Sequence, residues 1–310
     1  MHIQMNDMVC NIYISMNHQT TTPFSYLSAF QSFIGYLENT KKSLHTINNY
    51  RYDLTALHRY LEAQTHPSVQ SITQLHMSDI NSYSEYLRAK NFKTNTRRRK
   101  ILTIRKFLRY LSKRNLINIS ISELIPVPYK LERIPHTIVL KELHAVIKSL
   151  PTDNCLQTRN KILLWTLTAT GAQINEVARL QYEHFSKNTS KSCFLTIGNK
   201  KKRKVPIPNE LFQTVQVLRQ QFKASKQLPW IFTRFNRFGP LPTPITTRGI
   251  ELLLKSYAKH LNKSHLTSRT IRHSVIMQWL HDGRSREEIK TLLGLKSMYI
   301  FRSYTIPLNP

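Results

Sequence analysis

Basic and aromatic side chains that could do chemistry together gather near the C-terminus, between Thr267 and Thr305. Arg269, Arg272 and His273 stand at the beginning of a run whose apolar residues recur with helical spacing. Positive side chains at the N-terminal end of a helix suit an anion, because the backbone N–H groups there are also positively polarised. Tyr304, at the far end of the stretch, adds a phenol. The order of these residues predicts chemistry on a phosphate group.

A second helix is predicted inside the same stretch, over residues 286–293. Ser285 and Glu288 have the spacing of a capping box, and Gly294 follows the last periodic leucines. Pro307 stops any regular structure that continues past Tyr304.

These features resemble the C-terminal signature of the tyrosine recombinase (phage integrase) family. In that pattern a His-x-x-Arg-His box opens a helix, a Leu-Gly-His follows, and a nucleophilic tyrosine stands nine residues after that histidine. The matching residues here are Arg272, His273, Leu293, Gly294 and Tyr304. Arg269 replaces the first histidine of the pattern and Leu295 replaces the last.

Residues 170–185 resemble another motif of this family, Thr-Gly-x-Arg-x-Ser-Glu. Thr170, Gly171 and Glu176 match it, and Gln173 stands where the family has a catalytic arginine. The resemblance implies a site that has kept its nucleophile and one arginine and has lost several of their usual companions.

A tyrosine that attacks a phosphodiester must lose a phenolic proton whose unperturbed pKa is about 10. The non-bridging oxygens gain charge in the transition state and need fixed cationic donors, and the leaving 5′ oxygen needs a proton. Side chains can meet all of these needs, and the sequence has no evident carboxylate cluster for a metal ion. We therefore expect neither a metal nor another cofactor.

The elements that must position these residues carry a large positive charge. The 310 residues include 46 Lys plus Arg against 17 Asp plus Glu, a formal net charge of +29. Such a charge on a chain that is 40% hydrophobic predicts a folded protein with a polyanionic partner. Nucleic acid is the leading candidate, and an anionic membrane surface is the second.

Cysteine usage and hydropathy indicate in which cellular compartment the protein works. Cys10, Cys155 and Cys193 are odd in number and far apart, which argues against a disulfide framework and fits a reducing environment. The longest apolar stretch, around residues 162–167, is too short to span a bilayer. These observations predict a cytoplasmic protein.

The N-terminal third predicts four helices, over residues 24–37, 43–61, 78–87 and 95–113. Ser78 is the expected cap of the third. In the fourth, Arg98, Arg105 and Arg109 fall on one face beside the apolar stripe, as a row that could lie along a phosphate backbone. A solvated basic face is the alternative interpretation. The cluster at 97–100 favours DNA, because the sequence shows no acid nearby to pair it.

Two of these helices, at 43–61 and 95–117, resemble the core-binding domain of the same family in pattern and separation. The expected organisation is a leader at 1–20, a helical DNA-binding domain at 21–117, a proline-rich linker at 118–137 and a catalytic domain at 138–310. The predicted fold is mainly α with a small β-hairpin: a two-domain clamp around DNA.

The catalytic domain is expected to contain a basic hairpin. Strand-like runs at 193–198 and 204–208 flank a turn, and no acid lies between Lys187 and Pro208. A phosphate-facing tip is therefore expected, with Lys201, Lys202 and Arg203 as DNA contacts. The family delivers a catalytic lysine from this hairpin; the resemblance assigns it to Lys200, with Lys201 as the second choice. The remaining expectations are helices at 139–150, 156–168, 209–227 and 247–261, a strand at 228–233 and a proline-rich loop to 244.

The resemblance implies a role for each matching residue. Tyr304 would form a 3′-phosphotyrosyl link, Arg272 would bind the phosphate, and Lys200 would protonate the leaving oxygen. Arg269 would supply positive charge in place of a histidine. The supporting positions are His273, Glu176 and Gln173.

The sequence thus predicts a site-specific recombinase that pairs two double-stranded DNA sites as a homotetramer, away from membranes. The alternative is a weak or inactive homologue that acts as a sequence-specific DNA-binding accessory protein. A basic RNA-binding protein is a third interpretation, and Tyr304 could also be only a packing residue.

Overall fold

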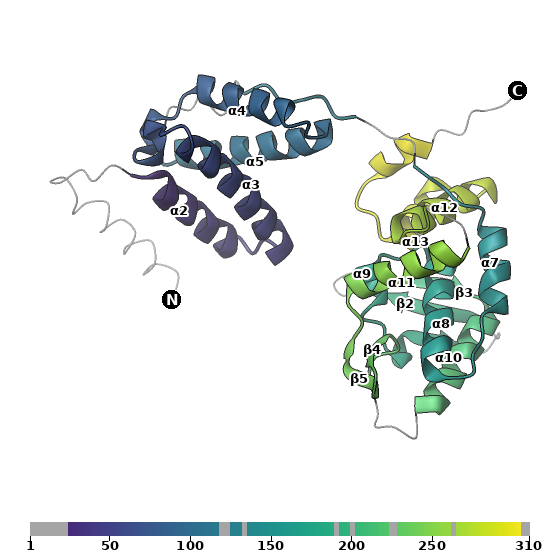
Figure 1. Cartoon of the computed structure of the whole chain (residues 1–310). Helices are drawn as coiled ribbons and strands as arrows, with labels where there is room; N and C mark the ends of the chain where they lie inside the picture. The colour runs from purple at the N-terminus through teal and green to yellow at the C-terminus, as the bar shows by residue number, and fades with distance from the viewer. Residues whose placement is uncertain are drawn as a thin grey trace, which may run out of the picture. The chain divides into compact units, whose positions relative to one another are not determined.

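A computed structural model describes residues 24–117, 125–131, 135–188, 192–198, 202–222, 228–261 and 265–304. The chain divides into two units, Met1–Leu131 and Glu132–Pro310, each with its own hydrophobic core (Figure 1). Each unit is described by itself below. None of the described helices is long and apolar enough to cross a lipid bilayer.

Residues 24–117 form the four helices that the sequence predicts: α2 (Tyr26–Asn39), α3 (Leu44–Glu62), α4 (Met77–Ala89) and α5 (Thr94–Ser112). Short 3₁₀ turns, η1 (Pro67–Val69) and η2 (Ile72–Gln74), join α3 to α4. Ser25 and Ser43 cap α2 and α3 through their side chains. The prediction that Ser78 caps the third helix is wrong. The helix begins earlier because the Asp79 carboxylate accepts the backbone N–H of His76 at 2.7 Å.

The stretch between the two units is partly fastened to the first one. Ile125 is buried in the N-terminal core, and the side chain of Asn95 exchanges two hydrogen bonds of 3.1 Å with the backbone of Leu131. Of the predicted linker 118–137, residues 125–131 therefore pack with the N-terminal helices. Residues 118–124 and 132–134 lie outside the described part.

The second unit is built around α8 (Cys155–Thr170), which is buried on nearly every side. It packs against α7 (Leu140–Ser149), α10 (Asn209–Phe222), α12 (Ser268–His281) and strand β3 (Arg203–Ile207). The remaining helical elements are α9 (Ile174–Val177), η3 (Tyr182–His184), α11 (Thr247–His260), α13 (Arg286–Leu293) and η4 (Met298–Tyr304). The predicted helix at 286–293 is confirmed, with Ser285 as its cap and Gly294 in the left-handed region.

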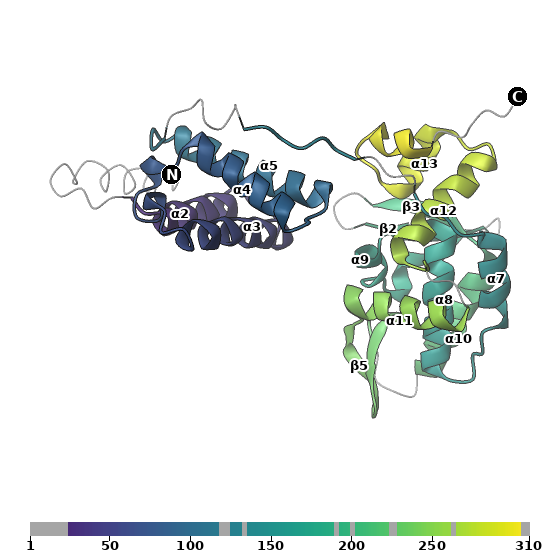
Figure 2. The same ribbon diagram turned by 45° about the horizontal axis from the view of Figure 1, so that its top comes forward.

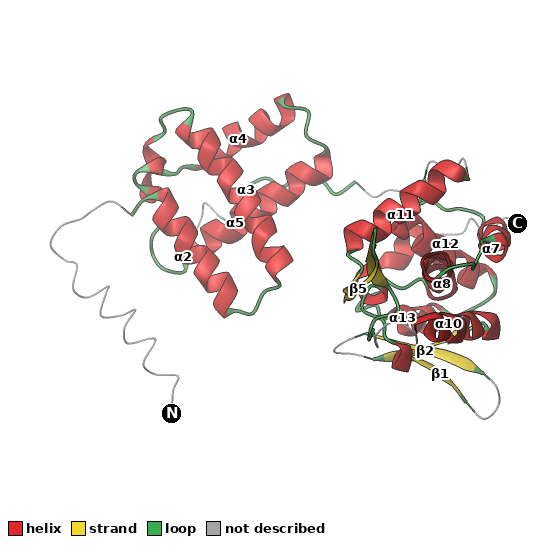
Figure 3. Cartoon of the chain, turned by 60° about the horizontal axis from the view of Figure 1, so that its bottom comes forward, coloured by secondary structure: helices red, strands yellow, loops and turns green. Residues whose placement is uncertain are grey.

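The predicted basic hairpin is confirmed as β2 (Cys193–Ile197) and β3 (Arg203–Ile207), which pair antiparallel. A short strand that the sequence did not indicate, β1 (Phe185–Lys187), pairs with β2 to complete a three-stranded sheet in the order β1-β2-β3. Alternating side chains of β2 enter the core. Figure 3 shows this sheet in yellow against the helices.

The predicted strand at 228–233 is wrong. Trp230 forms only an isolated bridge to Gln181, and the strand is β4 (Thr233–Asn236), paired with β5 (Gly239–Pro244). The sequence of β5 indicated a loop because it contains three prolines. A two-stranded sheet tolerates them, because each strand has one edge that needs no N–H donor.

Candidate active site

The guanidinium of Arg272, in α12, is held by two backbone carbonyls from other elements. Nη1 donates to the oxygen of Gly171 at 2.5 Å, and Nη2 donates to the oxygen of Leu293 at 3.3 Å. The side chain is half-buried. Burial lowers the pKa of Arg272 and the charge of Glu176 opposes that effect, so the group stays cationic at neutral pH. Because the two carbonyl contacts fix the side chain, its other N–H groups point in a fixed direction.

Gly171 is the residue that lets α12 come this close to the end of α8. Its φ of 57° is in the left-handed region, and it ends α8 as a C-cap. A Cβ at this position would come within 3.1 Å of side-chain atoms of Val275 and Leu293. The glycine is thus required both for its backbone conformation and for the space that brings its carbonyl to Arg272.

The phenol of Tyr304 contacts a second residue of α12. Nδ1 of His273 forms a short hydrogen bond with the Tyr304 hydroxyl, and the two ring centroids are 5.5 Å apart. Burial, followed by the charges of Arg269 and Arg272, lowers the pKa of His273 below its ordinary value. The imidazole is therefore neutral at pH 7 and can accept a proton from the phenol.

Tyr304 is buried, with 3% of its surface exposed, in a small cluster with Ile276, Leu293 and Phe301. Burial raises the pKa of its phenol well above the ordinary value, and the charge of Arg272 opposes this rise. The tyrosine is therefore protonated at neutral pH. Attack on a phosphate requires the proton to leave during the reaction and the hydroxyl to become accessible.

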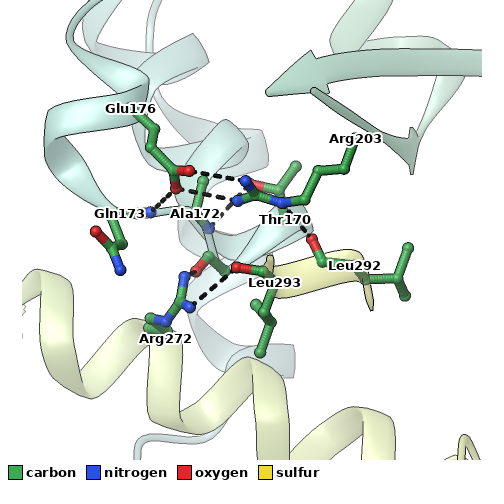
Figure 4. Close-up of polar contacts among 9 residues, drawn as sticks. Thr170, Ala172, Gln173, Glu176, Arg203, Arg272, Leu292 and Leu293 are labelled. Atoms are coloured by element: carbon green, nitrogen blue, oxygen red, sulfur yellow. Dashed lines mark hydrogen bonds and ion pairs between the residues drawn. The ribbon is translucent and has the colours of Figure 1, made fainter. Parts of the chain in front are cut away.

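Glu176 and Arg203 form a second charged centre beside Arg272. Nη1 and Nη2 of Arg203 donate to the two carboxylate oxygens of Glu176 at 2.7 and 3.0 Å (Figure 4). Glu176 also accepts the backbone N–H of Gln173 at 3.0 Å. Burial alone would raise the pKa of Glu176; the hydrogen bonds from Arg203 and Gln173 and the nearby arginine charges outweigh it, so the pKa lies below its ordinary value.

Two elements far apart in sequence meet here. Strand β3 packs against α13, and α13 packs against α12 (Figure 2). The contact brings Arg203, Arg272 and the segment that ends at Tyr304 into one region of the second unit.

Three positions depart from the pattern of the family resemblance. Gln173 is exposed and caps α9, with its side chain outside the Glu176–Arg203 pair (Figure 4). Arg269 is exposed one turn before Arg272, and its charge reaches His273. Leu295 is half-buried and packs against the cluster around Tyr304, so it contributes packing where the pattern has a polar ring.

The basic hairpin is described only in part. Lys200 and Lys201 lie outside the described residues. Lys202 is exposed just before β3, and its role as a DNA contact stays a prediction. Arg203 is placed differently from the prediction: its side chain is only 10% exposed and its guanidinium is occupied by Glu176 and by the carbonyl of Leu292. It points into the protein because a strand alternates its faces.

The basic face of the N-terminal unit also differs in part from the prediction. Asp53 of α3, which is 1% exposed, contacts Arg99, lies 3.3 Å from Nζ of Lys100 and accepts from the Thr103 hydroxyl at 3.0 Å. The expectation that no acid pairs the cluster at 97–100 is therefore wrong. The acid is distant in sequence and comes close only because α3 packs against α5.

The predicted arginine row lies along α5. Arg98 is half-buried and donates to the carbonyl of Pro128 at 2.7 Å, while Arg109 is exposed. Arg105 and Arg109 line one surface hollow, and Arg98 lines another. These positions stay candidates for contact with a polyanion.

Within the described ranges, no group of three or more His, Cys, Asp or Glu side chains is arranged to hold a metal ion.

Sequence reasoning missed two relationships at this site. One is the contact of His273 with Tyr304, and the other is the pairing of Arg203 with Glu176. The alternation of burial along β3 was the signal for the second, since Arg203 shares a face with Val205 and Ile207.

Comparison with known proteins shows the family of this chain. A family profile described as "Phage integrase, N-terminal SAM-like domain" matches residues 30–115, and one described as "Phage integrase family" matches residues 137–308. The chain therefore belongs to the phage integrase family, and it is a tyrosine-type site-specific recombinase.

Similar curated proteins include tyrosine recombinases XerC. The protein of Chlamydia trachomatis is 27% identical over 298 residues, covering 90% of this chain and 93% of the relative. That of Staphylococcus haemolyticus is 25% identical and covers 85% of this chain and 86% of the relative.

Two solved structures share the fold. XerH site-specific recombinase bound to difH substrate, in a pre-cleavage complex, has a TM-score of 0.68 at 15% identity and covers 91% of this chain and 82% of that one. A lambda integrase dimer bound to a COC′ core site has a TM-score of 0.64 at 13% identity and covers 91% and 95%.

Proposed function

We propose that this recombinase cleaves and rejoins DNA through a 3′-phosphotyrosyl link to Tyr304, with His273 as the group that takes the phenolic proton. The observation that carries the proposal is the hydrogen bond between Nδ1 of His273 and the Tyr304 hydroxyl, beside the anchored guanidinium of Arg272. A buried phenol that is protonated at neutral pH needs such an acceptor, and a neutral imidazole is one.

In the cleavage step the phenolic oxygen forms a bond to phosphorus while the bond from phosphorus to the 5′ oxygen breaks. The proton of the phenol passes to Nδ1 of His273, and the 5′ oxygen takes a proton from a hairpin lysine, for which Lys200 is our assignment and Lys201 the second choice. The reverse sequence, with a 5′ hydroxyl of another strand as the attacking group, restores the phosphodiester. Each step breaks one phosphoester bond and forms another, so the number of these bonds is the same before and after strand exchange.

Arg272 would bind the non-bridging oxygens. Its two carbonyl contacts fix the plane of the guanidinium, and a fixed donor costs no reorganisation when charge develops on the phosphate. Arg269 is exposed close to this group and adds positive charge at the helix end. It would assist binding of the phosphate and cannot serve as a base.

Binding to duplex DNA would use both units. The net charge of +29 and the arginines of α5 supply contacts to phosphates that do not depend on sequence. Lys202 would extend this surface near the active site. Two recognition sites held by a homotetramer are the arrangement we propose for exchange, because each site has two strands to cut.

The alternative function is a DNA-binding accessory protein with weak or no cleavage. Gln173 and Leu295 favour it, since each replaces a polar or charged group of the family pattern, and the loss of one transition-state donor typically costs about 10²–10³-fold in rate. Such losses are not additive, so their combined effect on the rate has to be measured.

Cleavage of a nicked suicide substrate distinguishes a recombinase that cuts DNA from an accessory protein that only binds it. Duplexes that the protein binds would be selected from a randomised pool, and a nick would be placed next to each candidate scissile phosphate so that the cleaved strand diffuses away. We expect a covalent protein–DNA adduct on a denaturing gel, lost in Tyr304→Phe and kept in Tyr299→Phe, which changes an exposed tyrosine of the same segment.

Tight, salt-sensitive binding with no adduct at any nick position would establish the accessory function instead. Competition by RNA as strong as competition by duplex DNA would count against both DNA functions.

A further inference from the structure

Every polar edge of the Arg203 guanidinium that faces the protein has a partner. Nε donates to the carbonyl of Leu292 at 2.7 Å, and the two terminal nitrogens bind Glu176 as a two-pronged pair. A planar fork on a carboxylate is the strongest geometry available to such a pair. The side chain is only 10% exposed, so the guanidinium is directed into the protein and away from the solvent side of the hairpin.

The residue at position 173 bears on why Glu176 pairs with Arg203. The sequence pattern that Thr170, Gly171 and Glu176 match carries an arginine at this position, and here the residue is Gln173, which has no charge. Glu176 keeps its carboxylate even so, with 20% of the side chain exposed. A half-buried carboxylate without a cationic partner is costly, and it would draw in the nearest free cation.

Arg272 is the other cation whose charge acts on this carboxylate. The carboxylate in turn stabilises the charged form of Arg272. We propose that Arg203 supplies the positive partner that Gln173 cannot supply to Glu176, and that this pairing leaves the guanidinium of Arg272 directed at the phosphate. Arg203 is then a positioning residue that touches no DNA. The inference rests on the proposed function, since it assigns a task within the same site.

The end of α13 supports the same role. Arg203 binds the carbonyl of Leu292 and Arg272 binds the carbonyl of Leu293, so two guanidinium groups hold consecutive peptide groups at the negative end of one helix (Figure 4). The chain continues from this helix end into η4 and Tyr304. Arg203 therefore also ties the basic hairpin to the segment that bears the nucleophile.

The test compares Arg203→Gln with the double variant Gln173→Arg/Arg203→Gln, in the suicide-substrate assay at saturating DNA. We expect Arg203→Gln to lower the rate of adduct formation by about 10²-fold, the size typical of a lost site donor, with the Kd for DNA nearly unchanged. The rate of the double variant should lie less than about tenfold below that of Gln173→Arg alone, because the arginine at position 173 returns a cation to Glu176. Gln173→Arg is the reference because this arginine can also raise the rate on its own. Lys204→Gln, on the exposed face of the same strand, is the matched control and should behave as the wild type.

A purely structural role predicts a different pattern. Arg203→Gln would then lower the midpoint of thermal unfolding, Arg203→Lys would restore it, and Gln173→Arg would restore nothing. An unchanged rate in Arg203→Gln, or a lost rate that Gln173→Arg leaves lost, would overturn the proposal.

A second measurement separates this proposal from the proposed function. The Glu176 carboxyl signal, identified with Glu176→Gln in protein carrying ¹³C-labelled glutamate, would be titrated by NMR without DNA. Its pKa should rise in Arg203→Gln and return toward the wild-type value in the double variant. This result is expected even from a protein that forms no adduct. If the pKa of Glu176 stays the same in both variants, the proposed role of Arg203 is wrong, and the proposed function is unaffected.

Discussion

Nδ1 of His273 and the hydroxyl of Tyr304, separated by 31 residues of sequence, form a hydrogen bond inside the second unit. Both rings are at least half-buried, and burial acts on them in opposite directions: it lowers the pKa of the imidazole and raises that of the phenol. The proton therefore rests on the tyrosine until attack begins, and the acceptor is already in place.

His273→Gln should lower the rate of adduct formation by about 10²-fold or more, the range expected for loss of a proton acceptor. Because the pKa of His273 is below its ordinary value, the wild-type rate should be constant at neutral pH and fall only in acid, below about 6.5, as the imidazole becomes charged. Single-turnover rates across pH measure both effects.

The fall of the rate in acid should be missing in His273→Gln. It should be present in His281→Gln, which changes an exposed histidine of the same helix. A fall that persists in His273→Gln would assign the proton to another group.

The lysine that protonates the leaving oxygen can be identified with a substrate whose leaving group needs no proton. Lys200→Ala should slow cleavage of a normal phosphodiester by about 10²–10⁴-fold, and Lys201→Ala should slow it much less. A substrate with sulfur in place of the 5′ bridging oxygen has a leaving group that needs no proton, so the defect of the acid variant should largely disappear. Rescue of Lys201→Ala rather than Lys200→Ala would transfer the role to Lys201.

Gly294 should be needed for the site and not only for its turn. It has a φ of 63°, and a Cβ there would lie 2.9 Å from Nη1 of Arg203. Gly283 offers a matched control, because its φ of 80° carries a similar backbone cost and a Cβ added there would meet no atom of the described residues within 4 Å. We expect Gly294→Ala to reduce the cleavage rate at least about tenfold more than Gly283→Ala, at similar losses of thermal stability. Equal rates would show that Arg203 tolerates displacement.

Asp53 should hold the N-terminal unit together. Replacing it with alanine leaves Lys100 and the Thr103 hydroxyl buried without their acceptor, and breaking a buried pair in this way typically costs about 3–5 kcal/mol. Chemical denaturation of the full chain should show an early transition in Asp53→Ala. Glu85→Gln, which removes an acid from an exposed pair with Arg88, should leave the curve unchanged. An unshifted curve in Asp53→Ala would mean that the buried cations are otherwise satisfied.

The local features of this protein could be predicted from its sequence because their causes lie within a few residues. Ser285 and Gly294 bound α13 correctly, whereas the Glu288 side chain pairs with Arg284; the alternating runs predicted β2 and β3. Apolar spacing likewise predicted the helices of the N-terminal unit. The strand at 239–244 was missed because its proline content indicates a loop, whereas its pairing with residues 233–236 is visible only in the tertiary structure.

The family, the two-part organisation and the identity of Tyr304 and Arg272 as the residues to examine are also properties of the sequence, since they depend on residue type, charge and spacing along the chain. What only the tertiary structure decided is which side chains satisfy one another. Asp53 neutralises a cluster that looks unpaired in sequence, His273 reaches Tyr304, and Arg203 turns inward to Glu176. Each is a contact between elements packed against each other, and a charge or a hydrogen bond acts over a few ångströms of space whatever the distance along the chain.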